Sequence, residues 1–231
     1  MPDNYYTKKL NAAKLFQVYD TKIPRIDQYL QAEIDFTKDY IKSEDKILEI
    51  GCGYGRIIKE LAPFAREITG IDISENSIKL GKDYLEQLGN VYLLVMDAHR
   101  IVLPSNTFDV VFCLQNGLSA MKGEPLSLIG SAARLLKPNG KALFSTYSPL
   151  FWEHRLAWFE EQADKKLLGE IDYDQTKNGV IVCKDGFTAK TFSEEDLAKL
   201  GEASCQRYEI KIVDNSSIFL VITKKPAMKS E

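Results

Sequence analysis

Apolar and polar residues follow one another along the chain in blocks that predict a repeated order of strand and helix. In the clearest block Ile47, Leu48 and Ile50 form a short apolar run, as expected of a buried parallel strand. Three glycines end this run, and apolar residues at helical spacing follow them. A strand, a glycine turn and a helix in this order bring backbone close to a ligand. Further strands are predicted at 67–73, 91–98, 108–114 and 141–147, and further helices at 74–88 and 126–136.

Both ends of the chain depart from this alternation. Residues 1–42 predict two helices, the first ending near Tyr19 and the second beginning at Pro24, a favoured first helical position. Residues 150–160 predict an amphipathic helix that contains both tryptophans. An aromatic stripe of this kind usually packs in a core, although a contact with a ligand or with a second copy of the chain stays open.

The last part of the chain predicts antiparallel pairing. Asp185-Gly186 between two apolar runs is a strong hairpin signal. Ser193 and Asp196 are expected to cap a short helix, which Gly201 is expected to end. The predicted strands here are residues 180–184, 187–192, 207–213 and 218–223.

Composition limits the classes to which the chain can belong. Its 231 residues, 45% hydrophobic and 27% charged, are ordinary for a soluble globular protein with a real core. A net charge of −3 argues against a broad surface for nucleic acid. No stretch approaches the roughly 18 apolar residues of a membrane span, and the N-terminus lacks a signal pattern, so we expect a cytoplasmic protein. The four cysteines form no C-x-x-C pair and there are only two histidines, so we expect no metal site.

The glycine turn itself carries chemistry. A dinucleotide site requires G-x-G-x-x-G, but here the third glycine, Gly55, comes one residue early and Arg56 occupies the position that the fingerprint needs. A full arginine side chain there would obstruct the approach of a pyrophosphate. An acid, Glu49, precedes Gly51 and Gly53 and could pair with a cationic group of a ligand.

A second acid, Asp72, ends the next predicted strand, 21 residues beyond Gly51. A carboxylate at such a strand end can accept hydrogen bonds from both hydroxyls of a ribose. This spacing suits dinucleotides and other nucleosides alike, so it indicates a nucleoside without choosing between them.

Five features in order along residues 47–147 resemble class I S-adenosylmethionine-dependent methyltransferases of the small-molecule type. They are Glu49-x-Gly51-x-Gly53-x-Gly55, Asp72, Asp97, Phe108-Asp109 and Lys137-Pro138-Asn139-Gly140. The resemblance implies an α/β fold: a doubly wound, Rossmann-like, seven-stranded and mostly parallel sheet with an antiparallel C-terminal strand. It further implies one domain over 1–231, made of an N-terminal helical lid (1–42), a cofactor-binding core (43–147), a helical and hairpin cap insertion (148–192) and a C-terminal helix with strands (193–231).

The resemblance also assigns roles to residues. It implies S-adenosylmethionine as cofactor, with Asp72 on the ribose, Asp97 and the N–H of Ala98 on the adenine, and Glu49 near the methionine amine. The full set of expected cofactor contacts is Glu49, Gly51, Cys52, Gly53, Asp72, Ile73, Asp97, Ala98 and Leu114. The expected substrate contacts are Tyr19, Asn116 and Tyr147, the candidate lid contacts are Tyr5, Tyr6, Tyr19 and Arg25, and the candidate bases are His99, His154, Tyr19 and Tyr147.

The function implied is methyl transfer to a small-molecule acceptor, with S-adenosylhomocysteine as product. In-line transfer from a sulfonium needs mainly positioning, so no catalytic residue is assigned. The loop at 115–119 lacks the Asn/Asp-Pro-Pro-Tyr/Phe signature of methyltransferases that act on DNA bases, glutamine or some RNA bases. An NAD(P)-dependent oxidoreductase and a non-catalytic module that binds S-adenosylmethionine stay open as alternatives, as do the acceptor and the oligomeric state.

Overall fold

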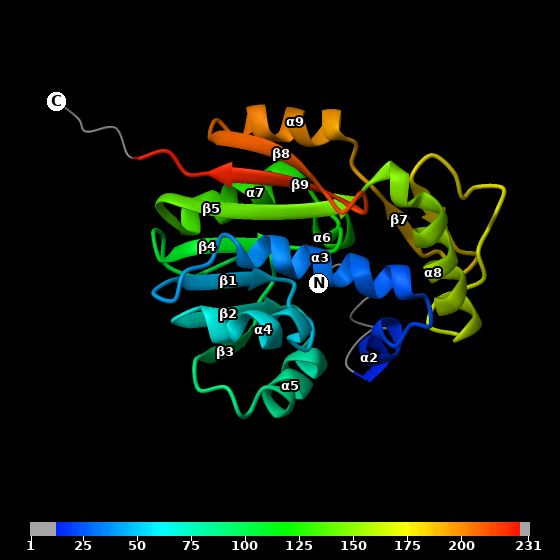
Figure 1. Ribbon diagram of the computed structural model, residues 1–231, viewed down its shortest axis with the longest axis horizontal. Coiled ribbons are helices and arrows are strands. Elements are labelled where there is room, and N and C mark those ends of the chain that lie inside the picture. Colours follow the sequence, from blue (N-terminus) through cyan, green and yellow to red (C-terminus); the bar gives the residue numbers. More distant parts are fainter. Residues whose placement is uncertain (1–12, 227–231) are drawn as a thin grey trace.

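The computed structural model describes residues 13–226, and a seven-stranded sheet in the order β3-β2-β1-β4-β5-β9-β8 runs through its centre (Figure 1). Its strands are β1 (Lys46–Ile50), β2 (Glu67–Asp72), β3 (Val91–Val95), β4 (Phe108–Cys113), β5 (Leu136–Tyr147), β8 (Arg207–Val213) and β9 (Ser217–Thr223). The first five are parallel, and β9 pairs antiparallel with both β5 and β8. The predicted sheet, mostly parallel with a reversed C-terminal strand, is confirmed.

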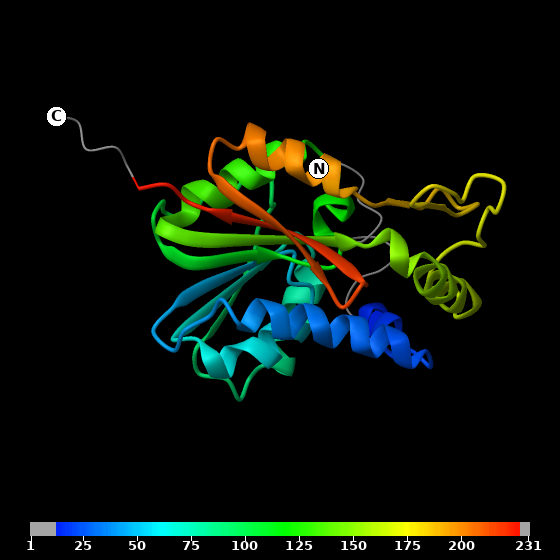
Figure 2. The same cartoon turned by 45° about the horizontal axis from the view of Figure 1, so that its top comes forward.

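Helices cover both faces of this sheet, as Figure 2 shows. The α-helices are α2 (Ala13–Tyr19), α3 (Pro24–Lys38), α4 (Arg56–Leu61), α5 (Glu75–Tyr84), α6 (Gly117–Ala120), α7 (Pro125–Leu135), α8 (Trp152–Asp164) and α9 (Glu194–Ala203), with short 3-10 turns at Ala62–Phe64 and Pro149–Phe151. The alternation of side chains along β9 accounts for the two layers. Ile218 and Leu220 pack with α7 and α9, whereas Phe219 and Val221 pack with α3 and α4.

A third hydrophobic cluster lies beyond the carboxyl ends of the parallel strands, where α8 and the hairpin of β6 (Val180–Val182) and β7 (Thr188–Lys190) stand (Figure 1). Trp158 and Phe159 of α8 pack there against Ile26 and Tyr29 of α3. The guanidinium of the buried Arg155 donates to the carbonyls of Gly179 and Ala189, both at 2.9 Å, and so ties the hairpin to α8. The aromatic helix therefore packs on α3 and the hairpin, while a role towards a ligand stays open.

Element ends differ from the sequence prediction where tertiary contacts decide them. The capping box of Ser193 and Asp196 forms as predicted, but α9 continues through Gly201 to Ala203. Gly201 is buried against the ring of Tyr208, so its missing side chain serves close packing and does not end the helix. The predicted turn before β5 lies within that strand as an irregularity at Asn139, whose φ of 63° is left-handed.

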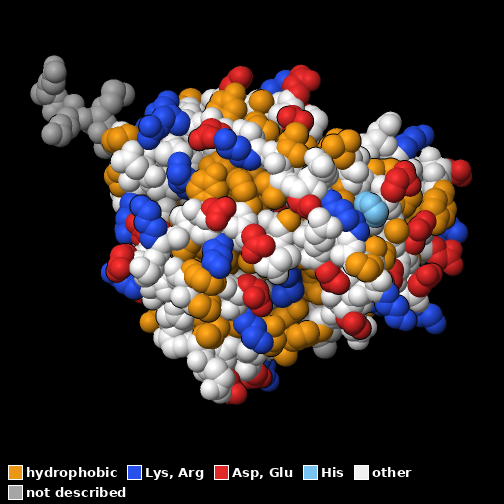
Figure 3. Space-filling model, viewed as in Figure 1, with side chains coloured by type: hydrophobic (Ala, Val, Ile, Leu, Met, Phe, Trp, Pro, Cys, Tyr) orange, Lys and Arg blue, Asp and Glu red, His pale blue; other side chains and the backbone are white. Residues whose placement is uncertain are grey.

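The surface adds two observations. Lysine and arginine alternate with aspartate and glutamate over the face seen in Figure 3, and neither sign gathers into a large patch. Within residues 13–226 no helix combines the length and apolar character needed to cross a membrane. Tyr5 and Tyr6, two of the candidate lid contacts, lie outside the described residues.

Alanine substitutions at two helical glycines test whether Gly201 is required for close packing. A Cβ on Gly201 would lie 2.5 Å from carbons of the Tyr208 ring, whereas one on the exposed Gly130 of α7 would meet nothing within 4 Å. We expect Gly201→Ala to lower the free energy of unfolding by about 1–3 kcal/mol, because overpacking outweighs helix propensity. Gly130→Ala should raise it by up to ~1 kcal/mol. Urea unfolding followed by circular dichroism measures both, and stabilisation by both changes would contradict the packing role of Gly201.

Candidate functional site

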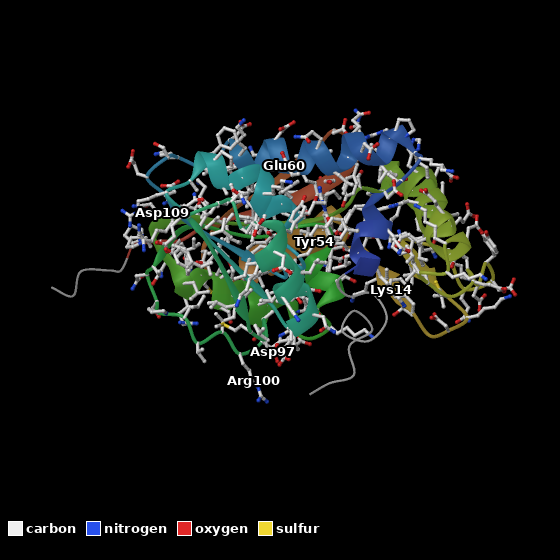
Figure 4. All side chains as sticks on the ribbon, turned by 90° about the horizontal axis from the view of Figure 1, so that it is seen from below. Lys14, Tyr54, Glu60, Asp97, Arg100 and Asp109 are labelled. Carbon is white, nitrogen blue, oxygen red and sulfur yellow. The ribbon has the colours of Figure 1, made fainter. Side chains whose placement is uncertain are left out.

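A cavity of about 260 Å³ opens at the carboxyl ends of the parallel strands. Its floor is the turn after β1 and the loops after β2, β3 and β4, and its roof comes from α2 and α8. Figure 4 shows Tyr54 of the turn close to α2, which carries Lys14, whereas Asp109 lies at the opposite end of the sheet. The strand order reverses between β1 and β4, and ligands of open α/β sheets bind at such a switch point.

The turn after β1 exists because glycine occupies its strained positions. Gly51, Gly53 and Gly55 have φ values of 80°, 54° and 86°, which side-chain-bearing residues rarely adopt. The N–H groups of Gly51 and Cys52 donate to the carbonyl of Ile71 at 2.8 and 3.0 Å. These bonds hold the turn against β2, and its backbone forms part of the cavity wall.

Acids at the ends of β2 and β3 face the same cavity. Asp72 accepts from the N–H of Gly53 at 2.9 Å through one carboxylate oxygen and from that of Ser74 at 2.8 Å through the other. Burial raises the pKa of Asp72, and these two donors oppose the rise. Asp97 accepts from the N–H of His99 at 2.9 Å. Each carboxylate keeps lone pairs for a ligand, because each oxygen accepts at most one of these hydrogen bonds.

The known proteins to which this chain is similar include methyltransferases. Residues 47–140 match a family described as methyltransferase domain. The matched segment supplies the turn after β1 and the loops after β2, β3 and β4, which form the cavity floor. A relative named ubiquinone biosynthesis O-methyltransferase, from Thiobacillus denitrificans, is 31% identical over 134 residues, which are 57% of this chain and 57% of the relative. The chain thus spans little more than half the length of that relative.

Solved methyltransferase structures share the whole fold. The N-methyltransferase NodS from Bradyrhizobium japonicum, solved with S-adenosylhomocysteine, matches this chain with a TM-score of 0.64 and 15% sequence identity. The match covers 97% of this chain and 100% of NodS. A methyltransferase from Methanosarcina mazei described as SAM-dependent matches with a TM-score of 0.60 and 21% identity over 81% of this chain and 95% of its own. At such identities these structures show that the fold is shared.

The structure brings together nearly all of the residues that the sequence predicts for the methyltransferase site. The cavity is lined by Glu49, Gly51, Cys52, Gly53, Asp72, Ile73, Asp97, Ala98 and Leu114, and also by Tyr19, Tyr147 and His99. They come from α2 and from the ends of all five parallel strands. Their individual roles in binding stay predictions.

Three candidate residues do not line the cavity and are corrected. Asn116 is buried with its amide donating to the carbonyl of Lys190 at 2.8 Å and its oxygen accepting from Thr146 at 2.9 Å, so it fastens β7 to β5. Arg25 forms an ion pair with Asp214. His154 is exposed on α8. Within the described residues, no group of three or more His, Cys, Asp and Glu side chains could hold a metal ion.

Sequence reasoning missed Gln115 and Glu33. Gln115 lines the cavity in a left-handed conformation with φ of 53°, and its N–H donates to Glu33 at 3.1 Å and to Ser145 at 2.8 Å. Glu33 comes from α3, is fully buried and also accepts from Ser217 at 2.7 Å. Burial raises the pKa of Glu33 to about 7. The sequence does hold a signal for Glu33, because an acid between Leu30 and Ile34 falls on the buried face of the predicted helix.

Burial of Glu49 in the cavity lowers the stability of the fold when its carboxylate is ionised. Its side chain is 4% exposed, and one carboxylate oxygen has no hydrogen-bond partner among the described residues. Burial raises its pKa from 4.5 to about 8, with Arg56 lowering it and Asp72 raising it further. Without a cationic ligand, ionised Glu49 therefore destabilises the fold.

This cost predicts a pH dependence. The pKa of Glu49 is higher in the folded than in the unfolded chain, so its contribution to stability is full below about pH 4.5 and is lost as pH rises towards 8. Glu49→Gln cannot ionise, so between pH 5 and 7.5 it should gain on the order of 2–3 kcal/mol relative to the unchanged protein. Urea midpoints at both pH values measure this. Glu60→Gln, an exposed change on α4, is the control, and equal pH slopes for all three proteins would contradict the assignment.

Proposed function

We propose that this cavity binds S-adenosylmethionine and that the chain transfers its methyl group to a small-molecule acceptor. The observation that carries the proposal is the presence of three acids, Glu49, Asp72 and Asp97, at the ends of the adjacent strands β1, β2 and β3, on one cavity floor. The bound S-adenosylhomocysteine of NodS and the activity named for the Thiobacillus relative support it.

The donors and acceptors of the floor match the parts of this cofactor. Asp72 lines the cavity and is held by two backbone N–H groups, and a carboxylate in this place suits the two hydroxyls of a ribose. Asp97 and Ala98 are adjacent on the wall, so a carboxylate and a backbone N–H can serve an adenine edge. Glu49 would take the methionine ammonium, and a cation there would offset the cost of its burial.

The roof suggests the acceptor class. Tyr19, Tyr147, Trp158, Phe159 and Phe187 line the cavity on this side. Among the described residues this side carries aromatic rings and no acid, which favours a neutral, apolar or aromatic acceptor over a cationic amine. The relative named an O-methyltransferase of ubiquinone biosynthesis supports a hydroxyl as the methylated group.

Methyl transfer here depends on positioning. The cofactor supplies the activated methyl group, and the cavity must hold an acceptor oxygen about 3–3.5 Å from it, in line with the sulfur. Tyr19 donates its hydroxyl proton to Gln115 at 2.8 Å, and burial raises its pKa, so Tyr19 orients groups and keeps its proton. The N-terminal helices and the 148–192 cap would together exclude water from the acceptor.

Binding of the cofactor product tests the first half of the proposal. We expect calorimetry to detect S-adenosylhomocysteine but not NAD. Asp72→Ala should weaken this binding by about 1–3 kcal/mol, the scale of lost charge-assisted hydrogen bonds, and Asp72→Asn by less because one acceptor oxygen remains. Asp83→Asn, an exposed change on α5, should leave the affinity unchanged. Tighter binding of NAD than of S-adenosylhomocysteine would contradict the proposal.

Turnover tests the second half. With S-adenosylmethionine present, S-adenosylhomocysteine should form faster with phenolic acceptors than with primary amines, since the described part of the roof offers aromatic surface and no acid. Coupled detection of S-adenosylhomocysteine over both acceptor panels measures this. Turnover of amines alone would contradict the acceptor class, and tight cofactor binding without any turnover would favour a non-catalytic binding module.

A further inference from the structure

Buried polar atoms without partners gather around one part of the cavity. Among cavity-lining residues they are one carboxylate oxygen of Glu49, Nε and Nη2 of Arg56, and Nε2 of Gln115. Native proteins pair more than nine in ten of such groups, so each needs an explanation. A ligand with matching groups would supply the missing partners.

Two of these groups, the Glu49 carboxylate and the Arg56 guanidinium, carry opposite charges but do not touch. Glu49 and Arg56 both belong to the described part of the chain, yet no ion pair joins them, so their charged atoms lie more than 4.0 Å apart. Arg56 still lowers the pKa of Glu49 through its charge. A carboxylate and a guanidinium held apart across one cavity are complementary to a zwitterion placed between them.

The geometry of Arg56 specifies the anionic end of that zwitterion. The N–H groups of Nε and Nη2 point from the same edge of the guanidinium plane, so together they form the fork that binds both oxygens of a carboxylate. The guanidinium lies 4.5 Å from the centre of the Tyr19 ring, which fixes it by a cation–π contact. Lys122 and His99 also line the cavity, but both are exposed.

Tyr19 also orients the third donor. Its hydroxyl donates to Oε1 of Gln115 at 2.8 Å, which leaves Nε2 of the same amide as a buried donor on the cavity wall. The left-handed backbone of Gln115 and its bond to Glu33 hold that side chain in place. One aromatic ring thus positions both the guanidinium and the amide.

We propose that Arg56, through Nε and Nη2, binds the α-carboxylate of the methionine part of the cofactor, with Gln115 Nε2 as a further donor. Arg56 and Glu49 would then bind the two charged groups of a zwitterionic amino acid, the carboxylate and the ammonium respectively. This inference rests on the proposed function, because it requires an adenosine sulfonium cofactor in the cavity. It also gives Arg56 a positive role, where the sequence showed only an obstacle to pyrophosphate.

Three probes separate the carboxylate from the rest of the ligand. They are S-adenosylhomocysteine, its decarboxylated analogue, which keeps the ammonium, and 5′-methylthioadenosine, which lacks the whole amino acid. Calorimetry on the unchanged protein should give about 10- to 100-fold tighter binding of the first than of the second, the scale of a bidentate charge-assisted contact.

Variants assign that preference to Arg56. Arg56→Gln should weaken S-adenosylhomocysteine binding about 10- to 100-fold and leave the other two probes within about threefold, while Arg56→Lys should fall between because lysine cannot form the fork. Gln115→Met should show a smaller loss of the same kind. Lys59→Gln, on the same helix with its ammonium over Tyr84, is the matched control and should change nothing.

Each outcome has a distinct meaning. Equal weakening of all three probes by Arg56→Gln would overturn the inference and leave Arg56 as a support for Tyr19. Equal binding of the carboxylated and decarboxylated probes by the unchanged protein would also overturn it, and this needs no variant to fold. Failure of the unchanged protein to bind any of the three probes would instead remove the proposed function.

Discussion

The hydrogen bonds that hold the glycine turn against β2 are the constraint on which the rest of the cavity depends. They fix Gly51 to Gly53 beside Ile71 and Asp72, in backbone conformations that only glycine adopts without strain. The turn then carries Tyr54, whose ring stacks on Phe16 of α2 at 4.1 Å between ring centres. The N-terminal helices therefore rest on the same turn that forms the floor, so floor and roof are positioned together.

The cavity shows a conflict between stability and function. Glu49, Arg56 and Gln115 keep polar atoms unpaired in a buried place, and the raised pKa of Glu49 reports the cost. By contrast, Glu33 and Asn116 are just as deeply buried but have bonds to neighbours, and they hold the surrounding elements together. Satisfied burial marks residues that hold the cavity together, whereas unsatisfied burial marks those for which we propose a ligand.

The strands and most helices of the fold could be predicted from the sequence, because local patterns of apolar residues determine them. Strands buried on both faces are continuous apolar runs, and Asp72 stands at the end of one of them, so its position could be predicted. Arg56, Gln115 and Glu33 could not be predicted, because their roles depend on a ring from α2, a left-handed backbone and an unusual acid inside a helix face. Asn116 was misassigned for the same reason, since its neighbour in sequence takes the cavity-facing position.

The roof of the cavity comes from segments outside the range of the family match. The family match covers residues 47–140, which supply the floor, whereas α2, α8 and the hairpin supply the aromatic roof from outside that range. This roof is itself tied together: Glu161 of α8 accepts from Thr21 at 2.5 Å, and the Trp158 indole donates to the carbonyl of Val18 at 3.1 Å. A roof built from separate segments can vary in sequence without disturbing the floor. The same division explains why residue patterns indicate the cofactor, while the acceptor has to be argued from how the roof packs.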